Sequence, residues 1–303
     1  MNLTVLKTFC DLVDSGSFSR AAESNYVSQS AVSQQLSKLE STLSVQLISR
    51  GGGIVVPTEA GKAFYRGAKE ICRRYEQLIG EVRSVSDSVR GTLRVGTIYS
   101  VGFYLLDPYV REFFQKHSEA NLYVSYTSWN QIYASVIDGE MDMGIVACPD
   151  ANRSLDIIPL EDEQLVVVCP PGDPLAHRES VVASDLEGRK FAAFSGNIPT
   201  RRHIDKLLKA AKVRVNITLE FDNIELLKRV IMIGSAVSIL PEESVRSEAL
   251  RGDLAFVPFR YPKRWTRPVG IVRRKDRQPT PAEVQFLTIL APKTKKKFFK
   301  VEE

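Results

Sequence analysis

The chain has 303 residues, enough for two or three domains, and its 44% apolar and 25% charged residues argue against extensive disorder. No run approaches the roughly 20 apolar residues of a membrane helix, and the first residues lack the basic start and the cleavage site of a signal peptide. We therefore expect a cytoplasmic protein without a membrane partner.

The formal charge of +5 does not by itself indicate a nucleic-acid partner. Residues 1–56 carry four basic and four acidic side chains, and much of the basic excess lies in the tail 293–303, which we expect to be solvated. None of the four cysteines has metal-ligand spacing to another, and the three histidines occur in unrelated contexts. We expect no metal, no cofactor and no Cys/His catalytic site.

Residues 1–57 predict a helical DNA-binding unit. Apolar residues at helical spacing begin with Leu3 and Leu6, Ser17 is a cap for a second helix, and Ser28 is a cap for a third. Residues 18–37 fit a helix-turn-helix, with Ala22 where the two helices cross and Val32 anchoring the second of them. Four residues of the third helix are expected to point inward, namely Val32, Leu36, Leu39 and Leu43.

The solvent face of the third helix carries hydrogen-bonding groups suited to DNA. Glutamine can pair with adenine, and serine hydroxyls suit bases or phosphates. The candidates are Gln29, Ser30, Ser33, Gln34, Ser37 and Lys38. Residues 45–61 then predict a strand, a glycine turn and a strand, a wing whose Arg50 could reach phosphate or the minor groove. The alternative is a small helical bundle whose polar face is only solvated.

Residues 58–90 predict one long linker helix. Apolar residues recur along one side at Ala60, Ala63, Phe64, Ile71, Tyr75, Leu78 and Val82. A stripe of that length needs a partner surface, and we expect a second copy of the chain to supply it. Packing against the remainder of the same chain is the alternative.

Residues 91–292 alternate strands and helices, which predicts an α/β domain. We expect strands over 92–97, 121–126, 141–146, 190–196, 215–221, 236–241 and 267–274, with another from Gln164, and helices over 98–114, 129–138, 199–211 and 223–234. This order suggests two lobes joined by two crossovers, one from 91–161 plus 267–292 and the other from 162–266.

Ligands of open α/β sheets bind beyond the carboxyl ends of the strands. The residues there are Thr97, Tyr99, Ser100, Ser128, Trp129 and Ala147 in one lobe, and Ser195, Asn197, Thr200, Arg201 and Asn223 in the other. Several of them begin helices, and the hydroxyls of Ser100 and Thr200 with the pair Arg201/Arg202 favour an anion. We predict a small carboxylate or phosphorylated metabolite, the alternative being that these residues only cap helices.

The run from Phe18 to Ile71 closely resembles the winged helix-turn-helix and linker of LysR-type transcriptional regulators. The matching elements are AA, VSQSAVSQQL, LE, L–SR and PTEAG in that order, and the part from TLRVGT to IMIGSAVSILP resembles the effector domain of that family. Two departures concern the base contacts: the family often has proline where this chain has Ser30, and the wing holds three glycines where a basic residue is common.

The resemblance implies a third helix in the major groove, with Arg50 on the wing, and paired linker helices giving a homodimer and often a homotetramer. It also implies a two-lobed effector domain of the type 2 periplasmic-binding-protein architecture. The predicted function is a sequence-specific regulator that binds double-stranded DNA and is switched by a small anion, with RNA polymerase as a further candidate partner.

Two other functions share the two-lobed scaffold. A solute-binding protein would need an export signal and no helix-turn-helix. An enzyme would need a base or a nucleophile in the cleft, and Cys148 is the only nucleophile candidate there, with no identifiable partner.

Overall fold

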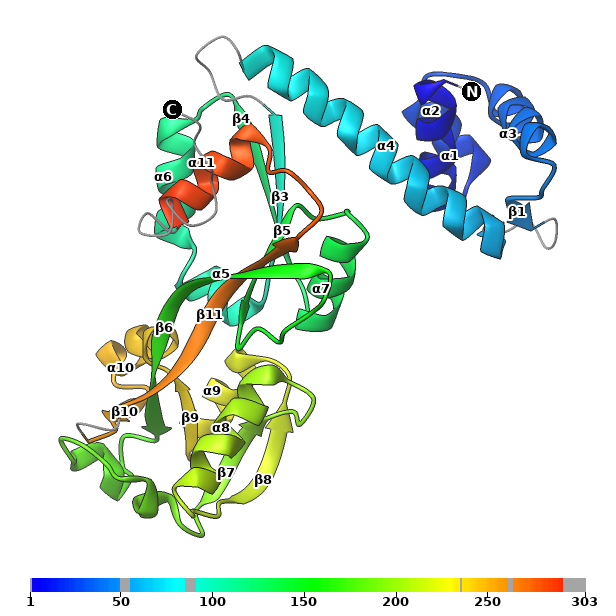
Figure 1. The fold of residues 1–303 in the computed structure, drawn as a ribbon. Helices are drawn as coiled ribbons and strands as arrows, with labels where there is room; N and C mark the ends of the chain where they lie inside the picture. The colour runs from blue at the N-terminus through cyan, green and yellow to red at the C-terminus, as the bar shows by residue number, and fades with distance from the viewer. Residues whose placement is uncertain (1, 50–54, 85–90, 235, 261–263, 291–303) are drawn as a thin grey trace. The chain divides into compact units, whose positions relative to one another are not determined.

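The computed structural model describes residues 2–49, 55–84, 91–234, 236–260 and 264–290. The chain divides into two compact units, the first built mainly from residues 1–91 and the second mainly from residue 92 onward (Figure 1). Among the described helices, none is long and apolar enough to cross a bilayer. A helical N-terminal unit followed by a mixed α/β unit confirms the predicted fold class.

Three helices open the first unit, namely α1 (Leu3–Ser15), α2 (Phe18–Ser24) and α3 (Gln29–Leu43). The side chains of Asn2, Ser17 and Ser28 each accept a hydrogen bond from a backbone N–H in the first turn of the helix that follows. The sequence predicted the second and third of these caps. Gly16, with a left-handed φ of 61°, ends α1.

The core of the three-helix unit confirms the crossing predicted between α2 and α3. Ala22 and Val32 are both buried and share a cluster with Phe9 and Leu12 of α1. The inward position predicted for Leu43 is wrong, because this side chain is 40% exposed. Leu43 is the last residue of α3 and lies beyond the part of the helix that the core covers.

A two-stranded wing follows α3. Strand β1 (Ile48–Ser49) pairs antiparallel with β2 (Val56–Pro57), whereas Arg50 and the glycine turn lie outside the described residues. The buried Glu40 of α3 holds the wing, because its Oε1 accepts hydrogen bonds from the backbone N–H of Leu47 at 2.7 Å and of Ile48 at 3.1 Å.

Helix α4 (Glu59–Ser84) is the predicted linker helix. Its first half packs against α1, where Phe64 meets the ring of Phe9 edge-on at 5.1 Å. Farther along, Ile71, Tyr75 and Leu78 are 49%, 48% and 48% exposed. The side chain of Val82 lies outside the described part of the structure. The apolar stripe therefore divides into one part that covers the three-helix core and one that this core leaves open.

One seven-stranded sheet runs through the second unit in the order β10-β6-β11-β5-β3-β4, with β9 also pairing with β6. The strands are β3 (Gly91–Thr97), β4 (Ala120–Tyr126), β5 (Met143–Ala147), β6 (Leu155–Cys169), β9 (Ser238–Pro241), β10 (Ala255–Pro258) and β11 (Trp265–Arg274). β6 and β11 pair antiparallel over their length and pass from one lobe into the other (Figure 1). These two strands are the crossovers that join the lobes.

Helices cover the sheet in both lobes. The first lobe has α5 (Tyr99–Tyr104), α6 (Asp107–Lys116), α7 (Trp129–Ile137) and α11 (Pro281–Leu290). The second adds the parallel strands β7 (Lys190–Phe194) and β8 (Asn216–Phe221), the helices α8 (Pro199–Ala210), α9 (Ile224–Met232) and α10 (Arg246–Arg251), and the 3₁₀ helices η1 (Pro174–His177), η2 (Ala183–Leu186) and η3 (Glu242–Ser244). Strands β3, β4, β5, β7 and β8 each end at or directly before a residue that lines the cavity between the lobes.

The structure corrects the predicted elements in three respects. The helix expected over 98–114 is two helices. Pro108 has no backbone N–H to donate to the preceding turn, so α5 cannot continue through it. In the first turn of α6 no such hydrogen bond is needed, and proline is tolerated there. The strand expected from Gln164 begins at Leu155, and β10, α10 and α11 were not predicted. The first half of β6 contains Pro159 and several acidic residues, a composition that does not indicate a strand.

Candidate functional site

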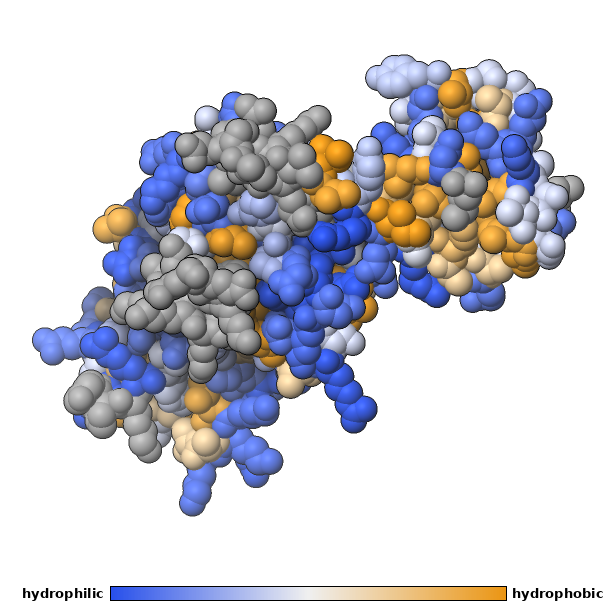
Figure 2. All heavy atoms as spheres, turned by 45° about the horizontal axis from the view of Figure 1, so that its top comes forward, coloured by the Kyte–Doolittle hydropathy of each residue, from blue (hydrophilic) through white to orange (hydrophobic). Residues whose placement is uncertain are grey.

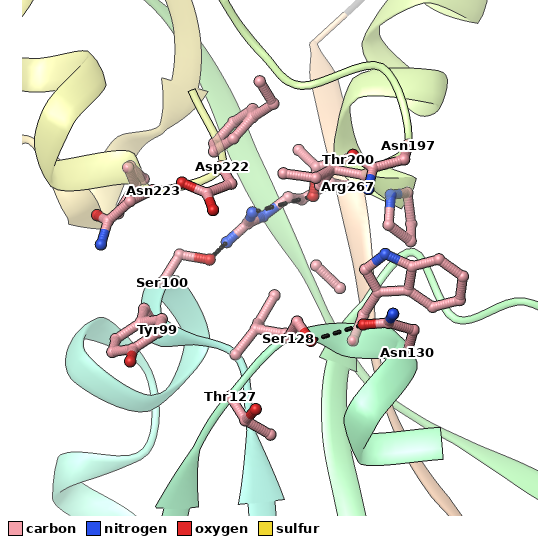
Figure 3. Close-up of a pocket in the computed structure, with 17 residues that line it drawn as sticks. Tyr99, Ser100, Thr127, Ser128, Asn130, Asn197, Thr200, Asp222, Asn223 and Arg267 are labelled. Atoms are coloured by element: carbon pink, nitrogen blue, oxygen red, sulfur yellow. Dashed lines mark hydrogen bonds between the residues drawn. The ribbon is translucent and has the colours of Figure 1, made fainter. Parts of the chain in front are cut away.

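A cavity of about 480 Å³ lies between the two lobes of the second unit (Figure 3). Its walls come from residues that follow strands or begin helices in both lobes, as expected for the carboxyl edge of such sheets. The lining consists of Ile98, Tyr99, Ser100, Thr127, Ser128, Trp129, Asn130, Ala147, Phe194, Asn197, Ile198, Pro199, Thr200, Asp222, Asn223, Ile224 and Arg267. Polar groups and apolar surfaces thus share one cavity of a size that suits a small metabolite.

Arg267 of β11 forms the floor of this cavity and is only 1% exposed. Its Nε donates to Oε2 of the buried Glu163 of β6 at 2.6 Å. One terminal nitrogen donates to the Ser100 hydroxyl at 3.1 Å and the other to the Thr200 hydroxyl at 3.4 Å (Figure 3). A single guanidinium therefore connects the first turns of α5 and α8, which belong to different lobes.

The structure brings together eight of the eleven residues predicted for the ligand site. They are Tyr99, Ser100, Ser128, Trp129, Ala147, Asn197, Thr200 and Asn223. Thr97 and Ser195 do not line the cavity: the Thr97 hydroxyl is buried and donates to the backbone oxygen of Ile145 at 3.1 Å, and Ser195 lies between β7 and α8.

The two arginines on which the anion argument rested are engaged elsewhere. Arg201 is outside the lining, and its Nε donates to both carboxylate oxygens of Asp205, at 3.0 and 2.9 Å. Its Nη1 donates to Glu220 and to the backbone oxygen of Phe194. Arg202 pairs with Asp150 and lies 5.5 Å from the ring centre of Trp129. Neither side chain presents an unpaired charge to a ligand.

Sequence reasoning missed Arg267 and Asp222. Arg267 could have been found as a charged residue at the start of an apolar strand. A charge buried in such a strand needs an ion-pair partner, which marks the position as unusual. Asp222 follows β8 and lines the cavity beside Asn223, as Figure 3 shows, and its carboxylate makes no hydrogen bond or ion pair with the described residues. The cavity thus contains an acidic group that forms no ion pair within the described part of the chain.

Cys148 follows β5 next to the cavity, in the left-handed conformation with φ 50°. Burial raises the pKa of its thiol to about 11. The thiol is therefore protonated at neutral pH, and a protonated thiol is a poor nucleophile. This position does not support the covalent chemistry that an enzyme would need.

Helix α3 presents the second candidate site, in the first unit. Six of the seven residues predicted to contact DNA are exposed, and the seventh, Arg50, lies outside the described residues. The exposed six are Gln29, Ser30, Ser33, Gln34, Ser37 and Lys38. The Gln29 amide oxygen accepts a hydrogen bond from the Ser19 hydroxyl of α2 at 3.3 Å. The exposed polar residues thus form one face of α3, and the opposite face of this helix packs in the core.

Comparisons with known proteins agree with both halves of this description. Residues 3–62 match the family model described as a bacterial regulatory helix-turn-helix protein of the lysR family. Residues 86–295 match the model of the LysR substrate binding domain. A probable RuBisCO transcriptional regulator of Synechocystis sp. is 27% identical over 296 residues, which are 96% of this chain and 85% of the relative.

Two solved structures have a similar fold. Full-length OxyR from Pseudomonas aeruginosa matches with a TM-score of 0.77 and 24% identity, over 96% of this chain and 94% of the other. Full-length CbnR in complex with its target DNA matches with a TM-score of 0.71 and 21% identity, over 96% and 99% of the two chains. The likeness extends over both units, so the arrangement of domains along the chain is shared as well.

Proposed function

The chain belongs to the LysR family of DNA-binding transcriptional regulators, and from this premise we propose that a small carboxylate bound in the cavity between the lobes switches its activity. The relatives are named as regulators and not as enzymes. DNA binding and an effector-binding domain are thus properties of this protein. The proposal concerns the chemistry of the effector, the residues that bind DNA and the assembly of the chain.

The contacts of Arg267 are the observation that carries the effector proposal. Because its N–H groups donate to the oxygens of Ser100 and Thr200, each hydroxyl keeps its own proton for another acceptor. Ser100 makes no other side-chain hydrogen bond with the described residues, so its proton is available to the cavity, whereas Thr200 shares its hydroxyl with the Cys148 thiol. A carboxylate above this floor would accept from the Ser100 hydroxyl beside a positive charge.

The other charges narrow the class of effector. Glu163 offsets the charge of Arg267, and Asp222 adds a negative charge to the lining. A doubly charged phosphate would therefore meet repulsion that a single carboxylate bears more easily. The Asp222 carboxylate can accept hydrogen bonds, which favours an effector that also carries a hydroxyl or an ammonium group. We accordingly retain the carboxylate and leave out the phosphorylated metabolite.

The proposed DNA contacts are those of α3 and the wing. The exposed glutamines, Gln29 and Gln34, suit base edges, while Lys38 and Arg50 suit phosphates. Burial of Val32 and Leu39 on the opposite side supports this orientation, since α3 can present only one face outward.

We further propose that α4 pairs with α4 of a second copy. The open part of its stripe, at Ile71, Tyr75 and Leu78, supplies an apolar surface of the kind that paired helices bury. Figure 2 shows apolar residues in orange at the surface of the N-terminal unit, among hydrophilic ones. A dimer would place two α3 helices on two half-sites. A homotetramer and a contact with RNA polymerase stay predictions.

Effector binding would act through the lobes. The ligand would contact α5 and α8 together and so favour one degree of lobe closure over another, since a ligand with equal affinity for both states shifts no equilibrium. Closure would then alter the geometry of the paired DNA-binding units.

Thermal unfolding in the presence of small acids tests the effector proposal. The probes are millimolar hydroxy and amino carboxylates, each paired with the amide in which –CONH₂ replaces the carboxylate. We expect at least one acid, and not its amide, to raise the Tm of the wild type and to lose this effect in Ser100→Ala. Thr218→Ala, which removes an exposed hydroxyl of β8, is the control and should respond like the wild type. Equal shifts by an acid and its amide would contradict the carboxylate.

A further inference from the structure

Tyr26 lies in the turn between α2 and α3 and is 97% exposed, more than any other large apolar side chain in the described part of the chain. Its side chain makes no hydrogen bond and no ring contact with the described residues. An aromatic ring wholly in water contributes nothing to this fold. A reason for the tyrosine has to come from outside the folded unit.

The backbone at this position makes the choice of residue more unusual. Tyr26 has φ 54°, in the left-handed region that glycine and asparagine adopt most readily. The turn itself is fixed by its neighbour, because Nδ2 of Asn25 donates to Asp11 at 2.7 Å and to the backbone oxygen of Ala21 at 2.9 Å. The turn therefore demands this conformation but not this side chain, and glycine or asparagine would suit it better.

The position of Tyr26 indicates which partner covers it. It precedes by two residues Ser28, the cap of α3, and by three residues the exposed Gln29. When the N-terminus of a recognition helix enters the major groove, the turn before it lies at the groove edge, where the phosphates are. Tyrosine hydroxyls are among the groups that contact DNA phosphates.

We propose that Tyr26 is a DNA-backbone contact, whose hydroxyl donates to a phosphate oxygen and whose ring lies against the adjoining sugar. The proposal rests on the proposed orientation of α3. It assigns Tyr26 to positioning, because a phosphate contact fixes the register of α3 in the groove without reading a base. Its loss should thus weaken binding to every sequence alike.

The test uses the full chain and duplexes that the wild type selects from a random library. Tyr26→Phe removes only the hydroxyl and should weaken binding roughly five- to tenfold, to selected and to random duplexes alike. Tyr26→Asn also removes the ring and should weaken binding further, while the chain unfolds at the wild-type temperature or above it. The salt dependence of binding should not change, because a neutral donor releases no counterion.

Two controls keep the outcomes distinct. Tyr123→Phe alters another exposed tyrosine, 61% exposed on β4, and should bind DNA like the wild type. Gln34→Ala reports on α3 alone. If Gln34→Ala changes the base preference while both Tyr26 variants bind normally, the Tyr26 proposal is overturned and the orientation of α3 stands. If Gln34→Ala and both Tyr26 variants all bind DNA like the wild type, the proposed orientation of α3 is overturned as well. A changed base ranking, or an altered oligomeric mass with normal DNA binding, in the Tyr26 variants would also overturn the phosphate contact.

Discussion

The two candidate sites of this chain are built in opposite ways. The proposed DNA-binding face is one side of a single helix, α3, and its residues come from a segment of ten positions, 29–38. The cavity collects residues from Ile98 to Arg267 and from both lobes. In the first site the polar groups are exposed, while in the second the most important cation is buried and paired.

This difference determines what a change of residue does. On the exposed face of α3 a polar side chain can be removed without leaving a buried group unpaired, so its loss should affect binding and spare the fold. On the cavity floor the same groups that would hold an effector also hold the two lobes together. Substitutions there should affect stability and binding together.

Arg267→Met should have the largest effect. It leaves the Glu163 carboxylate buried without its cation, and loss of one partner of a buried pair costs about 3–5 kcal/mol of unfolding free energy. Urea denaturation measures it. The double variant Arg267→Met with Glu163→Met removes both charges and should recover most of the loss. If the single variant is as stable as the wild type, the buried Arg267–Glu163 pair does not stabilise the fold.

Glu40→Ala should have the next largest effect, because Glu40 is a buried carboxylate in the DNA-binding unit. The backbone N–H groups of Leu47 and Ile48 would lose their acceptor, which should lower the unfolding free energy by about 2–4 kcal/mol. DNA binding should weaken as well, because the wing loses its attachment to α3. Glu23→Ala, at an exposed position of α2, is the matched control and should leave both measurements unchanged.

The same contrast explains how far sequence reasoning reached. The helices and caps of the first unit follow from local patterns, so Ser17, Ser28 and the exposed face of α3 could be predicted from neighbouring residues. Eight cavity residues could be predicted because strand ends converge in any open α/β sheet. These inferences needed only spacing and a general rule of topology.

The misses required knowledge of distant pairings. Arg267 and Glu163 are far apart in the chain and become partners only because β11 pairs with β6. Arg201 and Arg202 begin the same helix as Thr200 and were expected in the site, but carboxylates from other segments, Glu220 and Asp150, engage them. A sequence pattern states which charges exist and does not state which are already paired.

Substitutions on α3 should separate specificity from charge at a smaller cost than those on the floor. Gln34→Ala should lose about 1–3 kcal/mol of binding free energy at one base pair, with the unfolding free energy unchanged. Lys38→Ala should weaken all duplexes and lower the slope of log affinity against log salt by about 1. Binding isotherms at several salt concentrations on selected and single-base variant duplexes measure both. A loss of stability in either variant would remove the contrast with the cavity floor.

The smallest effect concerns the thiols of the partly buried Cys148 and the buried Cys10, which lie in different units. Burial raises the pKa of Cys148 beside the cavity from 9.0 to about 11, and that of Cys10 in α1 to about 12. A raised pKa means that the folded state favours the protonated thiol, so this contribution to stability is present below pH 9 and is lost as the pH rises toward the folded value.

The unfolding free energy of the wild type should therefore fall between pH 9 and 11 more steeply than that of Cys148→Ser or Cys10→Ala, neither of which retains the thiol in question. Urea midpoints at pH 8, 9 and 10.5 measure the difference between each variant and the wild type. The two variants should flatten the profile independently, because the thiols lie in separate units and share no partner. Parallel profiles for the wild type and both variants would show that neither thiol is as shielded from water as its burial indicates.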